Sequence, residues 1–127
     1  MLRQIWLALG WLWVAVVFYL SLMPHPPQPL SFNGVDKLEH AFAYAMLMAW
    51  FCQLYVERGM RIRLCLAFVA MGIGIEVLQG MGGVRYFEYA DMLANTTGVL
   101  LGWGLAQTGL GRVLSVLEKK AALRRGR

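Results

Sequence analysis

The sequence predicts an all-α protein: a four-helix transmembrane bundle with both termini in the cytoplasm, followed by an amphipathic C-terminal helix at the membrane interface. Hydrophobic residues make up 59% of the 127 residues, more than a soluble domain usually carries. Crossing a hydrocarbon core of about 30 Å takes about 17–25 apolar residues. Four segments meet this requirement: 5–23, 38–56, 64–81 and 92–110. We therefore expect one membrane domain over residues 1–110 and a basic cytoplasmic tail over residues 111–127.

The first apolar segment, 5–23, follows Arg3 and could be mistaken for a signal peptide. It is longer than the usual apolar region of a signal peptide, and it carries the bulky Trp11 and Trp13. It also lacks a small-x-small cleavage motif before Pro24. We therefore expect this segment to be retained as the first helix.

The connections at one end of the bundle contain residues that end or begin helices. A proline-rich loop over residues 24–29 ends the first helix, because proline cannot continue it. Asp36 and Asp91 stand where the second and fourth helices are expected to begin, and a carboxylate there suits the helix dipole. A glycine-rich connection over residues 80–85 joins the third and fourth helices.

The C-terminal tail has apolar residues at helical spacing among its Lys and Arg residues. Val113, Leu114, Leu117 and Ala121 form this pattern, which predicts an amphipathic helix lying on the anionic inner leaflet. The alternative is a basic tail that serves only to fix the topology.

The positive charges are distributed very unevenly between the two sides of the predicted bundle. Ten Lys and Arg residues fall on one side: Arg3, Arg58, Arg61, Arg63, Arg112, Lys119, Lys120, Arg124, Arg125 and Arg127. Only Lys37 and Arg85 fall on the other. Because loops rich in Lys and Arg stay in the cytoplasm, both termini are predicted to be cytoplasmic. The net charge of +5 is thereby explained by topology, so we expect no binding to nucleic acid.

Polar side chains gather at the opposite, outward-facing end of the predicted bundle. They are Asp36, Lys37, His40 and Tyr44 in the second helix, Glu76 and Gln79 in the third, Arg85 in the connection, and Asp91 and Asn95 in the fourth. Residues three, four or seven apart share one face of a helix, so each helix presents one polar stripe. An ionisable group near the centre of a membrane helix costs about 2.5–3.5 kcal/mol, and such groups are usually functional. We predict that the stripes form a shallow ligand-binding pocket, with a purely structural network as the alternative.

The order and spacing of these residues resemble the VanZ-like membrane protein family. The resemblance rests on Asp36-Lys37-x-x-His40-x-x-x-Tyr44, on Glu76-x-x-Gln79, and on Arg85, Asp91, Asn95 and Gly98-x-x-x-Gly102 that follow. It covers about residues 5–110 and implies a small protein of the bacterial cell envelope, in the cytoplasmic (inner) membrane. The namesake of the family is associated with low-level resistance to the glycopeptide antibiotic teicoplanin. The Gly-x-x-x-Gly pattern permits close helix approach, either within the chain or between two copies.

The chemistry of the polar end favours binding of a lipid headgroup. Lys37 and Arg85 are predicted to lie at the outer surface, beside the N-termini of the second and fourth helices. Positive side chains and helix N-termini both suit a phosphate or pyrophosphate group. We therefore expect an anionic or lipid-linked envelope precursor as the ligand, with the bilayer as the general partner and protein partners unidentified.

Two other functions remain open from the sequence. One is a membrane-embedded hydrolase or transferase with His40 as general base and Glu76 or Asp91 as its partner. The other is a scaffold for a larger envelope enzyme, which would dock on the aromatic first helix. The residues available for docking are Trp6, Trp13 and Tyr19.

A metal-dependent variant of the enzyme would use His40, Asp36, Glu76 and Asp91. A single His among carboxylates suits magnesium or calcium better than zinc. We expect neither a metal nor another cofactor as part of this protein.

Overall fold

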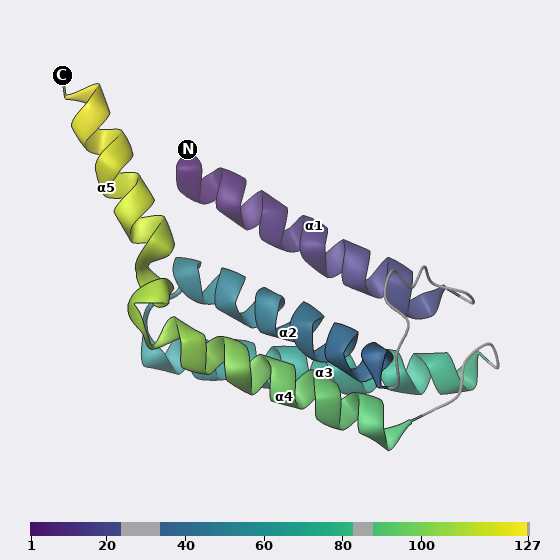
Figure 1. The fold of residues 1–127 in the computed structure, drawn as a ribbon. Coiled ribbons are helices and arrows are strands. Elements are labelled where there is room, and N and C mark those ends of the chain that lie inside the picture. The colour runs from purple at the N-terminus through teal and green to yellow at the C-terminus, as the bar shows by residue number, and fades with distance from the viewer. Residues whose placement is uncertain (24–33, 83–87, 127) are drawn as a thin grey trace.

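The computed structural model describes residues 1–23, 34–82 and 88–126, and all regular structure in these residues is helical. The elements are α1 (Leu2–Leu22), α2 (Val35–Leu54), α3 (Arg58–Met81), α4 (Tyr89–Ala106), the short 3-10 helix η1 (Gly109–Arg112) and α5 (Val113–Arg125). Helices α1 to α4 lie alongside one another as a bundle, and α5 projects from one end of it (Figure 1). The predicted all-α fold is confirmed.

Each predicted apolar segment corresponds to one helix. Helices α2 and α4 begin three residues before the predicted segments, and the larger differences lie at the end of the bundle that carries most of the positive charge. The expected loop around Arg58 and Arg61 is the first turn of α3, which begins six residues before the predicted segment 64–81. The connection between α2 and α3 is therefore short. Helix α4 ends at Ala106 instead of residue 110, because η1 turns the chain there.

Two helices, α1 and α3, have the length and the apolar composition needed to cross a membrane. Helices α2 and α4 have 20 and 18 residues, or roughly 30 and 27 Å at about 1.5 Å per residue. Their length therefore also suits a bilayer. They differ from α1 and α3 in composition, because they carry most of the polar side chains described below.

The closest helix pair is α2 with α4, and small residues make this approach possible. A Cβ atom at Gly102 would lie 2.5 Å from the carbonyl oxygen of Ala45, and one at Gly98 would lie closer still to that of Ala41. Close contact of this kind stabilises membrane helices through van der Waals packing. The Gly-x-x-x-Gly pattern is thus used inside the chain, between α4 and α2.

Helix α1 is attached to its neighbours largely by side-chain donors that reach backbone carbonyls. The indoles of Trp6 and Trp50 stack with their ring centres 3.9 Å apart, and each donates its N–H to the other's carbonyl oxygen, at 3.0 and 2.7 Å. Trp13 donates to the Ala43 carbonyl at 3.2 Å. Trp6 and Trp13 therefore face α2, so of the three aromatic residues expected to form a docking face only Tyr19 is largely exposed, at 68%.

Arg61 of α3 links the ends of α2 and α4 at the end of the bundle opposite to the polar residues. Its guanidinium donates to the carbonyl oxygens of Tyr55, Cys52 and Ala106, at 2.9, 2.9 and 3.2 Å. These carbonyls lie at the ends of α2 and α4, where no further helical turn can satisfy them. Gln53 then anchors the start of α5, because it accepts the Leu114 N–H at 3.2 Å.

Candidate functional site

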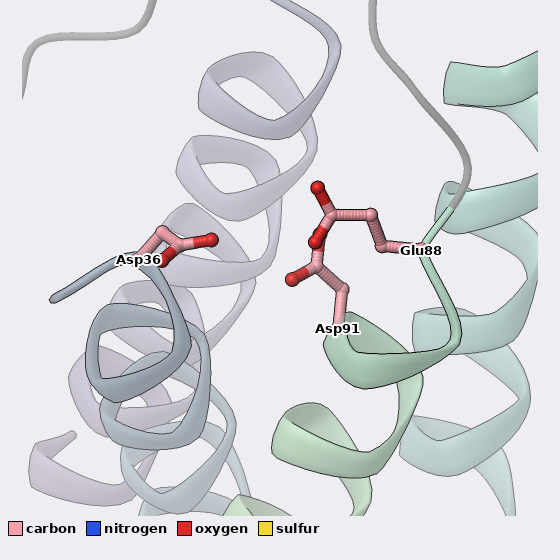
Figure 2. Close-up of side chains that lie close together, drawn as sticks. All are labelled: Asp36, Glu88 and Asp91. Carbon is pink, nitrogen blue, oxygen red and sulfur yellow. The ribbon is translucent and has the colours of Figure 1, made fainter. Parts of the chain in front are cut away.

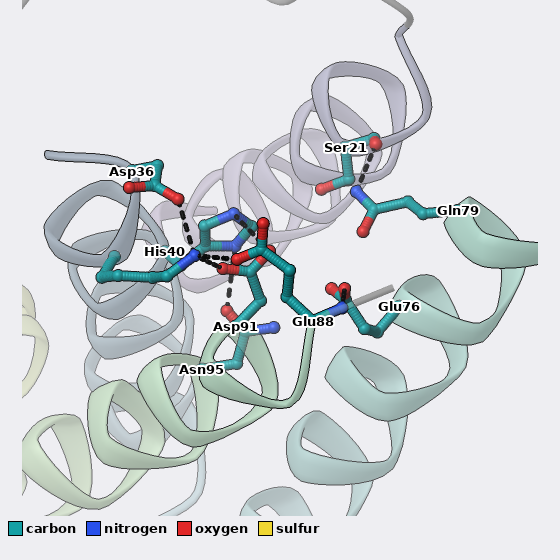
Figure 3. A network of polar contacts seen from close by, with 9 residues as sticks. Ser21, Asp36, His40, Glu76, Gln79, Glu88, Asp91 and Asn95 are labelled. Atoms are coloured by element: carbon teal, nitrogen blue, oxygen red, sulfur yellow. Dashed lines mark hydrogen bonds and ion pairs between the residues drawn. The ribbon is translucent and has the colours of Figure 1, made fainter. Parts of the chain in front are cut away.

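The starts of α2 and α4 meet at the polar end, where Figure 3 shows the side chains of Asp36, Glu88 and Asp91 close together. The ammonium group of Lys37 contacts all three carboxylates. Its Nζ donates to Asp36 Oδ2 at 2.7 Å and also to Glu88 Oε2 and Asp91 Oδ1. The side chains of Asp36 and Glu88 are 44% and 49% exposed, whereas that of Asp91 is only 6% exposed. One fixed, buried carboxylate and two solvent-facing ones therefore share a single cation.

Asp36 and Lys37 precede the apolar segment that begins at Leu38, and their contacts shift their titration. The hydrogen bond from Lys37 lowers the pKa of Asp36 below its ordinary value of 3.8. Burial alone lowers the pKa of Lys37, but hydrogen bonds to Asp36, Asp91 and Glu88 outweigh it and raise that pKa above its ordinary value. Asp36 is therefore ionised and Lys37 is protonated at neutral pH.

His40 lies one helical turn below Lys37 and connects α2 to α4. Its Nδ1 is 3.1 Å from Asn95 Oδ1. Because an amide oxygen only accepts hydrogen bonds, Nδ1 carries the proton. His40 Nε2 then faces Asp91, 3.9 Å from its Oδ2. In the neutral imidazole this leaves the Nε2 lone pair directed into the acidic group.

The two polar residues of α3 hold the neighbouring helix ends in place. Glu76 is 1% exposed, and its Oε1 accepts the backbone N–H of Glu88 at 2.6 Å, directly before α4. Gln79 donates from Nε2 to the Ser21 carbonyl at the end of α1, at 2.5 Å. All four helices therefore contribute to the polar end, with α3 linking α4 to α1.

Tyr44 lies below this group, on the next turn of α2 after His40. It is 1% exposed, and its hydroxyl has no hydrogen-bond partner among the described residues. Its ring lies close to Gly72, where an added Cβ would also come within 3.1 Å of Asn95. Tyr44 and Asn95 thus form the floor of the polar group.

The bundle is closed below that floor. Leu47, Met48 and Val99 fill its centre and have no exposed surface. Within the described residues, the buried polar side chains fall into two groups on either side of this apolar layer. They are Glu76, Gln79, Asp91 and Asn95 at one end and Gln53 and Arg61 at the other. The polar end is therefore a one-sided site, and no polar path continues through the described part of the bundle.

The polar site is recessed relative to the longest helix. The contact between Glu76 and the N–H of Glu88 places the start of α4 level with Glu76. Helix α3 continues to Met81, and five further residues rise by about 7.5 Å. Figure 1 shows the end of α3 extending past the starts of α2 and α4.

Three carboxylates at this site are close enough to hold a metal ion. Oxygens of Asp36, Glu88 and Asp91 lie within 4.8 Å of one another, and Figure 2 shows their side chains converging. Carboxylate oxygens suit magnesium or calcium. The ammonium of Lys37 already lies among them, so a metal ion would have to displace it. The set differs from the one expected from the sequence, because Glu88 takes part in place of Glu76 and His40 is not a member.

Most of the predicted site residues come together, and one important member had been missed. Asp36, Lys37, His40, Asp91 and Asn95 form a continuous set of contacts, whereas Arg85 lies outside the described residues. The sequence reasoning missed Glu88. Its position three residues before Asp91, at the start of a helix, could have indicated it, because residues three apart share a helix face.

Comparison of the sequence with known protein families gives one match. Residues 3–110 match the family described as VanZ/LLP1, so the match includes the whole polar site and all four helices of the bundle. Searches among curated proteins and among solved structures found no match. The match covers far more than half of the chain, and the chain belongs to the VanZ/LLP1 family.

Proposed function

We propose that this protein is a multi-pass protein of the bacterial cytoplasmic membrane that binds the anionic headgroup of a lipid-linked envelope precursor. In this arrangement all four bundle helices cross the bilayer, both termini are cytoplasmic and the polar site faces outward. The observation that carries the proposal is the polar site itself, which lies at one end of an otherwise apolar bundle and is centred on Lys37. Ionisable groups placed at such depth are usually functional.

The recess of the site supports a lipid-linked ligand. Because α3 continues beyond the start of α4, a bilayer matched to α3 would place the polar site below the outer surface of the membrane. A lipid headgroup already lies near this depth, whereas a freely soluble ligand would have to enter it. The closed apolar layer beneath the site supports binding from the outer side alone.

The exposed carboxylates suggest how an anion would bind at a site that is itself acidic. Asp36 and Glu88 are about half exposed and can turn away from Lys37, whereas the buried Asp91 stays in place. A phosphate oxygen would take their place on the ammonium group and form a charge-assisted hydrogen bond. Arg85, from the adjacent connection, is proposed to contribute a second positive charge.

The test compares the lipids that remain bound to purified variants, measured by native mass spectrometry in mild detergent. Arg85→Ala should lose an anionic lipid adduct that the wild-type protein retains. The double variant Asp36→Asn, Glu88→Gln should retain more of the adduct, because Lys37 is then free of two competing carboxylates. If the double variant instead loses the adduct, the site recognises a cation or an amine, and the proposal is wrong.

A matched control separates binding from folding. Asp36→Asn and Glu88→Gln change the charge but keep the size of each side chain, and Asn or Gln can still accept a hydrogen bond from Lys37. The helical content, measured by circular dichroism, should therefore stay unchanged. Loss of stability in Arg85→Ala, His40→Ala and Glu76→Ala, with no change in any adduct, would support a purely structural network.

A membrane-embedded hydrolase or transferase is a second candidate, favoured by the position of His40. Asn95 holds the ring through Nδ1, and Nε2 lies 3.9 Å from Asp91 Oδ2, beyond hydrogen-bond distance. Nε2 is therefore the nitrogen that would accept a proton from a substrate bound between His40 and Asp91. The contact of Glu76 with the N–H of Glu88 favours Asp91 over Glu76 as the partner of His40. His40→Ala should then abolish turnover of a phosphorylated lipid while the lipid adduct is retained.

The proposed ligand also connects to glycopeptide resistance. We propose that the protein changes the amount or the exposure of lipid-anchored cell-wall components, which would alter the response to teicoplanin. Expression of the wild-type chain in a susceptible bacterium should raise the minimal inhibitory concentration of teicoplanin. Expression of Arg85→Ala at an equal level should not, and an equal increase with both chains would separate resistance from headgroup binding.

A further inference from the structure

A groove lies between the start of α1 and the side of α5, at the end of the bundle opposite to the polar site. Its volume is about 300 Å³, and it is lined by Met1, Leu2, Glu118, Ala121, Ala122 and Arg125. A volume of this order suits a small ligand or part of a larger one. Figure 1 shows α5 projecting away from the bundle beside the start of α1.

The side of α5 that faces this groove is set by helical spacing. Leu114, Glu118, Ala121, Ala122 and Arg125 recur at intervals of four, three, one and three residues, which places them on one face. Leu114 is fully buried and fixes the base of the helix against the bundle. The two small alanines then leave room between α5 and α1, and Arg125 lies at the far end of the groove.

The ion pair of Arg3 with Glu118 leaves Arg125 as the charge available to a ligand. Arg3 donates to Glu118 Oε1 at 3.1 Å and to the Leu54 carbonyl at 2.9 Å, so the Glu118 charge is already compensated. Within residues 1–23, 34–82 and 88–126, no ion pair involves Arg125. The groove therefore offers an unpaired guanidinium above small and apolar side chains.

We propose that this groove binds one anionic phospholipid of the inner leaflet, with its phosphate on Arg125 and its glycerol region against Ala121 and Leu2. The apolar wall continues into the exposed face of α1, where Ile5 and Leu9 are about half exposed, at 49% and 46%. That face belongs to a helix apolar enough to cross a membrane, so acyl chains can follow it. This continuity favours a phospholipid over a soluble phosphate.

The basic residues around the groove strengthen the attraction without forming the site. Lys119, Lys120 and Arg124 lie on other faces of α5 and raise the local positive potential. Lys120 and Arg124 also share a face with Val113 and Leu117, so α5 is less cleanly amphipathic than its sequence suggested. Lys120 and Arg124 would have to enter the membrane if α5 lay flat with the face of Val113 and Leu117 buried. A defined lipid bound beside α5 does not require this.

In the test, phosphatidylglycerol or phosphatidylcholine is added in increasing amounts to the detergent-solubilised full chain. Native mass spectrometry then counts the lipids that remain bound. The wild-type protein should prefer phosphatidylglycerol. Arg125→Ala should weaken its retention by about fivefold, as expected for one Arg near a phosphate. Ala121→Leu should weaken it comparably by filling the groove, and leucine is compatible with a helix.

Arg124→Ala is the matched control, because it removes the same charge one residue away, from a different face of α5. Its effect should be clearly smaller than that of Arg125→Ala. Equal losses in the two variants would mean diffuse electrostatic attraction, and equal retention of the two lipids would mean no recognition of charge; either result overturns the proposal. Repeating the titration with Arg85→Ala separates this groove from the polar site at the other end.

Discussion

At the scale of single residues, Lys37 decides the electrostatics of the polar site. Three carboxylates surround one ammonium group, and only Asp91 among them is buried. A buried carboxylate without a cationic partner is strongly destabilising, and Lys37 supplies that partner for Asp91. The exposed Asp36 and Glu88 have water as an alternative partner. They are therefore the exchangeable members of the group.

The lowered pKa of Asp36 predicts a pH-dependent contribution to stability. A carboxyl group whose pKa is lower in the folded state stabilises that state above its unfolded pKa, and the contribution is lost as the pH falls through the folded value. At neutral pH, Asp36→Asn should lower the free energy of unfolding by less than about 1 kcal/mol, because the Asp36 side chain is 44% exposed and Lys37 keeps Glu88 and Asp91 as partners. The difference in melting temperature from wild type should shrink below about pH 4. A difference that grows toward acid pH would contradict this assignment.

The sequence indicated most of this site because helical spacing groups Asp36 with His40 and Asp91 with Asn95. It could not assign the partners across helices. Glu76 was one of the two expected partners of His40, yet one of its oxygens accepts the backbone N–H of Glu88. Which side chain meets which depends on the rotation and offset of each helix, and those are set by packing, for example at Gly98.

At the scale of helices, the contact between α2 and α4 predicts a sharp difference among three glycines of α4. Gly98→Ala and Gly102→Ala should each lower the free energy of unfolding by about 1–3 kcal/mol, because the added methyl group would overlap the backbone of α2. Gly104→Ala should be neutral or stabilising by up to about 1 kcal/mol, because nothing lies within 4 Å of its added Cβ. Thermal unfolding in detergent would measure all three. A similar loss in all three would mean that the α2–α4 contact does not set these positions apart, because helix propensity alone favours alanine over glycine at each of them.

Also at the scale of helices, Arg61 has a structural role that the sequence did not suggest. Arg61 was counted only as a topological charge, but it is 8% exposed and donates to carbonyls at the ends of both α2 and α4. Arg61→Met should lower the free energy of unfolding by more than about 2 kcal/mol, because several buried carbonyl groups lose their donor. Arg63→Met, on an exposed position of the same turn, should change it by less than about 0.5 kcal/mol. Chemical denaturation of both variants tests this, and equal effects would exclude a specific role for Arg61.

At the scale of the whole molecule, apolar composition predicted the number and order of the bundle helices correctly. It could not distinguish the roles of the helices. Helices α1 and α3 are apolar enough to cross a membrane by composition, whereas α2 and α4 hold the polar site and pack most closely together. The polar residues that lower the hydropathy of α2 and α4 meet between these two helices at the polar end. The bundle therefore has two helices, α1 and α3, that are apolar enough to cross a membrane, and a closely packed pair, α2 and α4, that carries most of the polar site.

This division makes α4 the most informative helix for membrane topology. In a chain whose buried native Cys52 and Cys65 are replaced by Ala, single cysteines at Ala90 and Gln107 would mark the two ends of α4, where both positions are exposed. If α4 crosses the bilayer with the polar site outward, a membrane-impermeant maleimide should label Ala90→Cys in intact spheroplasts. It should label Gln107→Cys only after permeabilisation, because the Arg-rich side of the bundle stays in the cytoplasm. Labelling of both positions in intact spheroplasts would mean that α4 does not cross, and the opposite pattern would place the polar site and Lys37 in the cytoplasm.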